Sequence, residues 1–136
     1  MDEPDESFET QLQLNLAAPY YCSKLFGKVM RSKRNGHIFN ICSIASKEPV
    51  LNGGSYSVTK SALLCLNNVM RQELAGHNVK VTAVLPGQTI TSSWEGTEIP
   101  ENSFVKPSDI AEVVFSALNL SKGANIDEII IRPVTF

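Results

Sequence analysis

Apolar residues recur at helical spacing in three segments of the chain. These segments cover about residues 7–34, 55–75 and 107–118, and each pattern predicts a helix with one apolar face. Pro19 lies inside the first segment. Because proline has no N–H to donate and its ring clashes with the preceding turn, we expect either a kink there or two helices that nearly join.

Cap residues predict where these helices begin and end. Asp5 or Ser7 is suited to cap the first helix, and Asn35-Gly36 is expected to stop it. Gly76 is expected to end the second helix, since glycine is common just past a helix C-terminus. Pro107 opens the third helix, at a position where the missing N–H of proline does no harm.

Three short β-prone runs alternate with the helices. They cover about residues 37–42, 79–85 and 128–133 and are rich in Val and Ile. Strands that alternate with helices of this length connect through right-handed crossovers and pair in parallel. The pattern therefore predicts an α/β fold with about three parallel strands and flanking helices.

The loops that follow the strands are where a ligand is expected. In an open parallel sheet, ligands bind at the carboxyl ends of the strands. Here those ends are Ser43, Pro86-Gly87 and Pro133. Residues 43–56 and 87–104 are therefore the segments in which to seek the function.

The composition is that of an ordinary globular protein. Of the 136 residues, 43% are apolar and 19% are charged, which fits one domain over residues 1–136. The formal net charge of −2 favours neither nucleic acid nor an anionic membrane as a partner. No apolar run reaches transmembrane length, and the acidic start of the chain is unlike a signal peptide. The expected location is cytoplasmic.

The cysteines and histidines suggest neither a disulfide nor a metal site. Cys22, Cys42 and Cys65 include no CxxC pair and are odd in number, so we expect buried free thiols in a reducing compartment. His37 and His77 have no partner at metal-ligand spacing. We therefore expect no bound metal.

Tyr56 and Lys60 form the candidate chemical pair. They are four residues apart at the start of the second helix, which puts both side chains on one face. A phenol has a pKa of about 10, and a neighbouring ammonium favours its ionised form, so such a pair suits acid-base work. Ser43 lies 13 residues before Tyr56, at a strand end from which its hydroxyl can bond a carbonyl oxygen as charge develops there.

The same spacing occurs a second time in another context. Tyr20 and Lys24 are also four apart, and Ser7 is also 13 residues before Tyr20. However, Ser7 lies in an acidic helix start, and Tyr20 follows a proline in mid-helix with no strand before it. A surface Tyr and Lys on a helix is the ordinary alternative for either pair. Because a short motif needs its structural context, we favour Tyr56 and Lys60.

Several motifs resemble those of the short-chain dehydrogenase/reductase family, and they occur in the family's order over nearly the whole chain. They match the family's helical asparagine, the strand that delivers its active-site serine, its catalytic helix, the strand and loop beside the nicotinamide, and the start of its last helix. In that order the segments are Asn15-Leu16, residues 36–46 (GHIFNICSIAS), residues 54–63 (GSYSVTKSAL), residues 79–87 (VKVTAVLPG) with Thr91, and residues 106–111 (KPSDIA).

The resemblance implies a role for each of these residues. Tyr56 would exchange a proton with the substrate oxygen, Lys60 would activate Tyr56 and bond the nicotinamide ribose, and Ser43 would hold and polarise the carbonyl. Asn15 would bend its helix and hold a water that links Lys60 to solvent. The structural alternatives are a turn residue for Ser43, a helix kink for Asn15 and a cap for Thr91. The residues expected to contact the cofactor are Tyr56, Lys60, Pro86, Gly87 and Thr91.

The family's activity implies an oxidoreductase on a partial Rossmann-like, doubly wound sheet. It would move hydride between NADP (or NAD) and a small carbonyl or alcohol substrate. Residues 88–106 would form a substrate lid or, alternatively, an ordinary loop. Residues 126–134 resemble the branch of 3-hydroxy acid, serine-type and sepiapterin-like reductases, which mostly use NADP. The first helix and the Tyr56 helix form the dimer interface in many relatives, so we expect a homo-oligomer.

The chain departs from the family in the part that grips the pyrophosphate. The family opens with a strand, a glycine-rich turn and a helix, but no G-x-x-x-G-x-G or G-x-G-x-x-G motif occurs here. The strand at 37–42 would then have an unpaired edge. We therefore expect a truncated oxidoreductase or, alternatively, a catalytically inactive remnant that acts as a dimerisation or interaction module.

Overall fold

The computed structural model of the chain describes residues 2–134. Within these residues, a long first helix is followed by alternating strands and helices, as the sequence predicts. None of the described helices is both long enough and apolar enough to cross a membrane. In chain order the elements are α1 (Asp5–Leu12), a π-helical segment (Gln13–Ala17), α2 (Ala18–Lys33), β1 (Gly36–Ile41), α3 (Gly54–Ala75), β2 (Val79–Pro86), α4 (Pro107–Leu118) and β3 (Glu128–Ile131).

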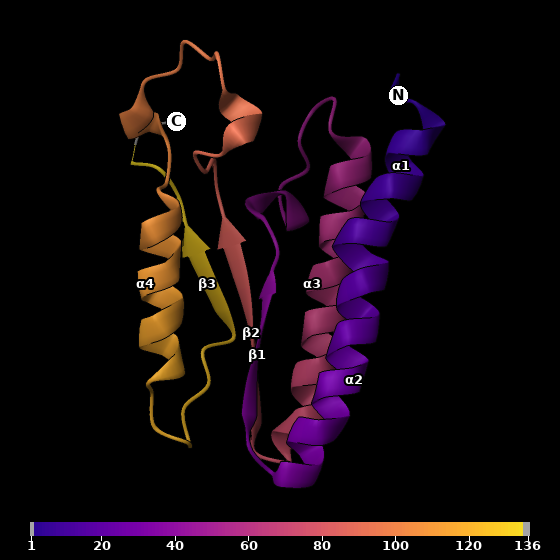
Figure 1. The fold of residues 1–136 in the computed structure, drawn as a ribbon, viewed down its shortest axis with the longest axis vertical. Helices are drawn as coiled ribbons and strands as arrows, with labels where there is room; N and C mark the ends of the chain where they lie inside the picture. The colour runs from indigo at the N-terminus through magenta and orange to yellow at the C-terminus, as the bar shows by residue number, and fades with distance from the viewer. Residues whose placement is uncertain (1, 135–136) are drawn as a thin grey trace.

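The three strands form one parallel sheet in the order β1-β2-β3 (Figure 1). Gly36 of β1 is opposite Val79 of β2, and Ala83 of β2 is opposite Glu128 of β3. β2 lies in the middle, and its residues Val81 and Val84, which face opposite sides of the sheet, are both 0% exposed. Burial on both faces explains its nearly continuous apolar run. The predicted α/β fold with three parallel strands is confirmed.

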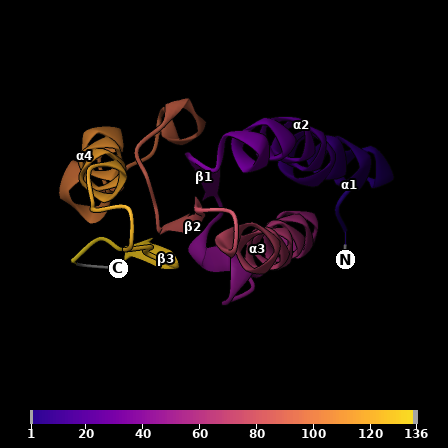
Figure 2. The same ribbon diagram turned by 90° about the horizontal axis from the view of Figure 1, so that it is seen from below.

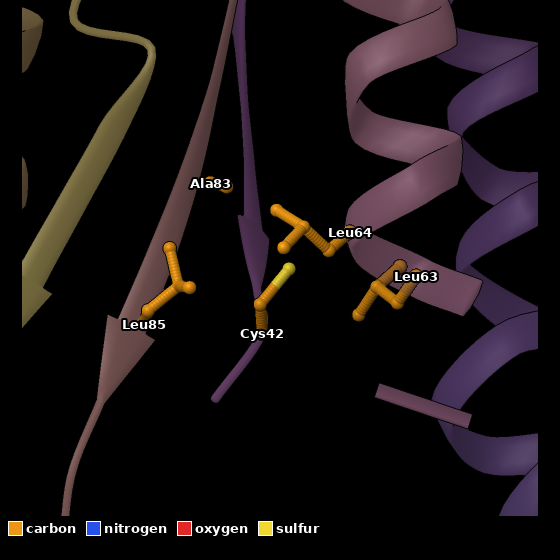
Figure 3. Close-up of a cluster of buried hydrophobic side chains, with 5 residues drawn as sticks. All are labelled: Cys42, Leu63, Leu64, Ala83 and Leu85. Atoms are coloured by element: carbon orange, nitrogen blue, oxygen red, sulfur yellow. The ribbon is translucent and has the colours of Figure 1, made fainter. Parts of the chain in front are cut away.

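Helices cover both faces of the sheet. α2 and α3 lie side by side on one face, and α4 lies on the other (Figures 1 and 2). Between α3 and the sheet, Leu63 and Leu64 pack with Leu85 and its neighbours (Figure 3). Each fully buried side chain of this size contributes about 1.5–3 kcal/mol relative to exposure. On the α4 side, the buried cluster consists of Val84, Ala117 and Ile129.

The helices begin and end near the predicted residues, but the residues that cap them differ from the predicted ones. The residue that precedes α1 as its cap is Pro4, where Asp5 or Ser7 was expected. Arg34 takes the left-handed conformation after α2, with φ of 50°. Gly76 follows α3 with right-handed dihedrals, and Asn78, with φ of 57°, makes the left-handed turn. Asparagine is enriched in this region, so Asn78 makes its turn without a glycine.

Only one of the three cysteines is buried. Cys42 is 2% exposed, as expected, whereas Cys22 and Cys65 are exposed. The prediction of buried thiols was therefore wrong for these two residues. Both lie within apolar stretches of α2 and α3, and both are exposed all the same. All three are free thiols.

His37 in β1 is held as a neutral ring. Its Nε2 lies 2.7 Å from the hydroxyl of Thr82, and that hydroxyl donates to the carbonyl of Ile126 at 2.6 Å. Since the hydroxyl proton is committed to Ile126, Nε2 is the donor to Thr82. The ring also stacks on Phe39 at a centroid distance of 3.8 Å. Burial, and secondarily the charge of Lys80, lowers the pKa of His37 from 6.5 to about 4.

This lowered pKa predicts a loss of stability in mild acid. The unfolded chain takes up a proton as the pH falls below 6.5, whereas the folded chain does so only near 4. The stability that the neutral His37 ring contributes is therefore complete above pH 6.5 and is lost as the pH falls toward 4. Below that pH, His37 causes no further loss. Partial exposure of the ring reduces the expected loss to about 1–2 kcal/mol at about pH 5.

Urea unfolding at about pH 7.5 and about pH 5 measures this loss. We expect His37→Gln, whose amide can still donate to Thr82, to show a smaller difference between the two conditions than the unaltered chain. The matched control is His77→Gln, in the turn that follows α3. Equal pH dependence in the unaltered chain and the His37 variant would contradict the prediction.

Candidate active site

Ser43 is fixed at the end of β1 by reciprocal capping. Its Oγ accepts from the N–H of Ala45 at 3.1 Å, and its own N–H donates to Oγ of Ser46 at 3.2 Å. Ser46 in turn donates from Oγ to the carbonyl of Lys60 at 2.9 Å. The short 3-10 turn Ile44–Ser46 therefore connects the candidate serine to the helix that carries the candidate lysine. Ser43 therefore does act as a turn residue, as the structural alternative expected. This contact does not exclude a catalytic role for its hydroxyl.

Tyr56 and Lys60 lie in the first turns of α3. The Nζ atom of Lys60 is 5.7 Å from the centroid of the Tyr56 ring. Nζ also donates to the carbonyl of Ile41, at the end of β1, at 2.8 Å. The lysine therefore bridges the phenol and the carboxyl end of the strand before Ser43.

Burial shapes the electrostatics around this lysine. It lowers the pKa of Lys60, an effect that the nearby Cys42 partly opposes. Burial also raises the pKa of Cys42 from 9.0 to about 11, although the charge of Lys60 counteracts part of that rise. At neutral pH, Cys42 is therefore a neutral thiol that packs in the core, and Lys60 carries the positive charge at this edge of the sheet.

Asn15 lies in the π-helical segment that joins α1 to α2. Pro19 has no N–H for the carbonyl of Asn15, four residues earlier, and the helix widens here so that the N–H of Ala18 bonds the carbonyl of Gln13 instead. The predicted interruption is thus a π-helical segment within one long helix. The Nδ2 atom of Asn15 donates to Oγ1 of Thr59 at 3.1 Å. This bond brings the asparagine against the residue that precedes Lys60.

The chain after β2 is tightly packed at Gly87. Its N–H donates to the carbonyl of Ile131 at 2.7 Å, and a Cβ there would lie 3.1 Å from Cδ of Pro133. A side chain there would require Pro133 to shift, so glycine suits this close approach of two segments of the chain. Thr91 is exposed and precedes the 3-10 turn Ser92–Trp94. Among the described residues it makes no hydrogen bond to Ser43, Tyr56 or Lys60, so its expected cofactor contact stays a prediction.

Residues 88–106 form a loop with a fixed base. The N–H of Ile90 donates to the carbonyl of Val105 at 3.0 Å, and the N–H of Val105 donates to the carbonyl of Gln88 at 2.8 Å. Above that base, Trp94 and Phe104 meet edge to face at a centroid distance of 5.1 Å. Phe104 is only 7% exposed. This part of the loop is therefore held by an aromatic contact and backbone bonds.

The second tyrosine–lysine pair has the same internal geometry. Nζ of Lys24 is 5.7 Å from the ring centroid of Tyr20, as in the pair formed by Tyr56 and Lys60. Tyr20 is 42% exposed and lies on α2, away from the strand ends. The spacing alone therefore creates the same side-chain contact twice, and only the position in the fold separates the two pairs.

Several residues that hold the candidate site residues in place were not predicted from the sequence. Thr59 is 0% exposed and receives the Asn15 amide. Glu3 accepts from the N–H and Oγ of Ser55 at 2.9 and 2.8 Å, which lowers the pKa of Glu3 and caps α3 beside Tyr56. Ser46 could have been found, because Ser43-Ile44-Ala45-Ser46 has the spacing of a capping box. The contacts of Thr59 and Glu3 span more than 40 residues and left no local signal.

Comparisons with known proteins give this geometry a context. Residues 1–101 match the family model described as short chain dehydrogenase. An uncharacterized oxidoreductase of Staphylococcus epidermidis is 30% identical over 129 residues, which are 95% of this chain and 56% of that protein. The chain therefore spans little more than half the length of a curated relative that it matches.

Solved structures share the fold over almost the whole chain. A β-ketoacyl-[ACP] reductase from Bacteroides thetaiotaomicron is 30% identical with a TM-score of 0.80, over 98% of this chain and 56% of its own. Serine dehydrogenase from Escherichia coli is 26% identical with a TM-score of 0.86, over the same shares. A closed form of serine dehydrogenase, 24% identical and likewise at 0.86, is complexed with NADP+. Since both enzymes match, the expected serine-type branch stays a prediction.

Proposed function

This chain belongs to the short-chain dehydrogenase family, and from that premise we propose that it is the catalytic half of an NAD(P)-dependent oxidoreductase that reduces carbonyls or oxidises alcohols. The observation that best supports the proposal is the position of Lys60. Its ammonium lies 5.7 Å from the Tyr56 ring and binds the carbonyl at the end of the strand that leads to Ser43. On this proposal Ser43, Tyr56 and Lys60 act together near the carboxyl edge of a parallel sheet, where ligands bind.

The proposed chemistry divides the work among these side chains. In the reductive direction, Ser43 Oγ donates a hydrogen bond to the substrate carbonyl and stabilises the developing negative charge. Tyr56 Oη then gives its proton to that oxygen, with the Lys60 ammonium beside its ring. Asn15 holds α3 through Thr59 and so positions Lys60. A bound nicotinamide supplies or accepts the hydride.

The residues present suit one part of the dinucleotide only. At Gly87 the space for a Cβ is taken by Pro133, and the N–H is bonded to the carbonyl of Ile131, so the glycine is explained by packing and the proposed ligand contact of this turn rests on the family resemblance. We propose that Tyr56, Lys60, Pro86, Gly87 and Thr91 contact the nicotinamide half of NADP (or NAD). The sequence holds no glycine-rich motif that could bind the pyrophosphate. On this proposal, that motif would come from the part of a relative that this chain does not match.

Titration with NADPH and NADH, followed by nicotinamide fluorescence, tests this assignment. We expect no saturable binding by the 136-residue chain alone, because the pyrophosphate has no site. We expect binding and carbonyl reduction by a chimaera in which the part of E. coli serine dehydrogenase that this chain does not match is joined to it. A folded chimaera that binds neither cofactor would refute the oxidoreductase proposal, and tight binding by the chain alone would refute the assignment of a half site.

A catalytically inactive interaction module is the second candidate function. Large apolar side chains on α2 favour it, since Tyr21, Leu25 and Phe26 are 68%, 63% and 57% exposed. Patches of this kind mark interaction sites, and self-association through α2 and α3 would cover part of them. Light scattering that shows a monomer which binds no full-length relative would count against this candidate.

A further inference from the structure

An asparagine followed by a glycine occurs twice in the chain, at Asn35-Gly36 and at Asn52-Gly53. In this dipeptide the asparagine side chain is readily attacked by the next backbone nitrogen, because glycine has no side chain to shield that nitrogen. Glycine also gives the backbone the widest range of dihedral angles in which the attack can occur. Since the two dipeptides are identical, the fold decides which of them reacts.

Asn52 lies at the exposed tip of the turn that leads into α3. The N–H of Gly53 donates to the carbonyl of Val50 at 3.2 Å, which closes this turn. Asn52 has a φ of 59°, an angle that asparagine tolerates in turns. It is exposed, and its neighbour Leu51 is 91% exposed. Opening one turn bond is therefore enough to free the backbone nitrogen of Gly53 beside an accessible amide.

Asn35-Gly36 is held by the sheet instead. Gly36 is the first residue of β1 and lies opposite Val79 of β2. Further along β1, the N–H of Cys42 donates to the carbonyl of Val84 in β2. Because the direction of the backbone groups alternates along a strand, the N–H of Gly36 faces β2 as well. Freeing this nitrogen requires the start of β1 to separate from β2, and opening a strand costs more free energy than opening a loop.

We propose that Asn52 is a site of spontaneous deamidation, which converts it to aspartate and isoaspartate while the fold protects Asn35. The backbone nitrogen of Gly53 gives up its proton and attacks Cγ of Asn52. A C–N bond forms there and closes a succinimide ring, the bond from Cγ to Nδ2 breaks, and Nδ2 leaves with a proton as ammonia. Water then adds to either carbonyl of the ring and breaks its bond to the nitrogen. The sum is hydrolysis of one amide, with no oxidant or reductant.

The new carboxylate appears just before the helix that carries Tyr56 and Lys60. Gly53 is the cap residue of α3, so Asn52 is one residue outside the cap. Anions are stabilised near a helix N-terminus, so the aspartate form leaves α3 intact and makes the formal net charge of −2 more negative by one unit. The isoaspartate form also lengthens the main chain by one carbon. The fraction converted therefore increases with the age of a molecule, at a position next to the candidate active site.

Incubation of the purified chain at physiological temperature and mildly alkaline pH, followed by trypsin digestion and mass spectrometry, tests this inference. Trypsin cleaves after lysine and arginine, so Asn35 and Asn52 fall in separate peptides, residues 35–47 and 48–60. Each conversion raises the mass of its peptide by about one dalton. We expect Asn52 to convert about tenfold faster than Asn35 or more, because the turn opens more readily than the strand. An unincubated sample digested in parallel corrects for conversion during digestion.

Two neighbouring glycines provide a matched pair of variants. Gly53→Ala places a Cβ 3.6 Å from Val50, which is an ordinary contact. We expect it to slow the conversion of Asn52 by about tenfold or more, because alanine shields the nitrogen and restricts the backbone. Gly54→Ala, with a Cβ 3.5 Å from the carboxylate of Glu3, is the control and should convert at the unaltered rate. Circular dichroism of each variant establishes that its fold is retained.

The chain unfolded in urea shows what the fold contributes, and there we expect Asn35 and Asn52 to convert at similar rates. Equal rates at the two sites in the folded chain would overturn the inference. So would a folded chain in which Asn52 stays intact for as long as the unfolded chain needs to convert it, or a Gly53→Ala variant that converts at the unaltered rate. These readouts do not depend on enzymatic activity, so the proposed oxidoreductase and this inference can fail separately.

Discussion

Replacing Tyr56 by phenylalanine in the chimaera with serine dehydrogenase is expected to lower kcat by about 10²–10⁴-fold. The substitution removes the hydroxyl that gives its proton to the carbonyl oxygen and leaves a ring of the same shape beside Lys60. Cofactor affinity should change little, because Lys60 and Gly87 remain. Steady-state kinetics combined with a fluorescence titration of NADPH separates the two effects.

The chain contains its own control for this experiment. Tyr20 has a lysine at the same distance, 5.7 Å from its ring centroid, but it lies on α2 beside the groove between α2 and α3. Tyr20→Phe should therefore leave kcat within about twofold, since substitutions away from a site have small effects. Comparable losses in both variants would point to a general effect of losing a phenol, and full activity in Tyr56→Phe would remove that residue from the mechanism.

Replacing Leu85 by alanine is expected to destabilise the fold by about 2–5 kcal/mol. Leu85 is 1% exposed and packs with Cys42 and Leu63 between the sheet and α3 (Figure 3). Its loss leaves a cavity in a layer that the rigid sheet cannot close. Because folded domains are stable by only about 5–15 kcal/mol, this variant should unfold at a much lower urea concentration.

Leu51 is the matched control for this substitution. It is 91% exposed, in the loop before α3, and Leu51→Ala should change stability by less than about 0.5 kcal/mol. Urea unfolding curves of the two variants test the difference directly. A loss of less than about 1 kcal/mol for Leu85→Ala would mean that the core between α3 and the sheet is not packed as described.

Local patterns were sufficient to predict the elements of this fold. The helical spacing of apolar residues located three helical segments, the first of which holds both α1 and α2. The burial of β2 on both faces is visible in its apolar run. The positions of Ser43 and Lys60 near the strand ends followed from the order of those elements. Parallel strands joined by helical crossovers can adopt few arrangements, so the same sequence of elements also limits the possible strand orders.

Contacts between distant segments were not accessible in this way. The bond from Asn15 to Thr59 joins residues 44 apart, and the bond from Lys60 to Ile41 requires α3 to pack on β1. Neither has a signature in spacing or composition. The left-handed turn at Arg34 and the exposure of Cys22 also depend on the surrounding structure. Residue type alone therefore predicted the helix end at Asn35-Gly36 and a buried Cys22.

The loop that carries Ser43 is tied to β3 by two ion pairs. Lys47 pairs with Glu128, and Arg132 holds Glu48 through two hydrogen bonds, the shorter of which is 2.6 Å. Arg132 comes 84 residues after Glu48. At ribosomal rates of about 5–20 residues per second, that distance corresponds to about 4–17 s of translation. A nascent chain therefore lacks both ion pairs for this interval, and a chaperone or protease that samples emerging polypeptides meets residues 47–48 before residues 128–132 can secure them.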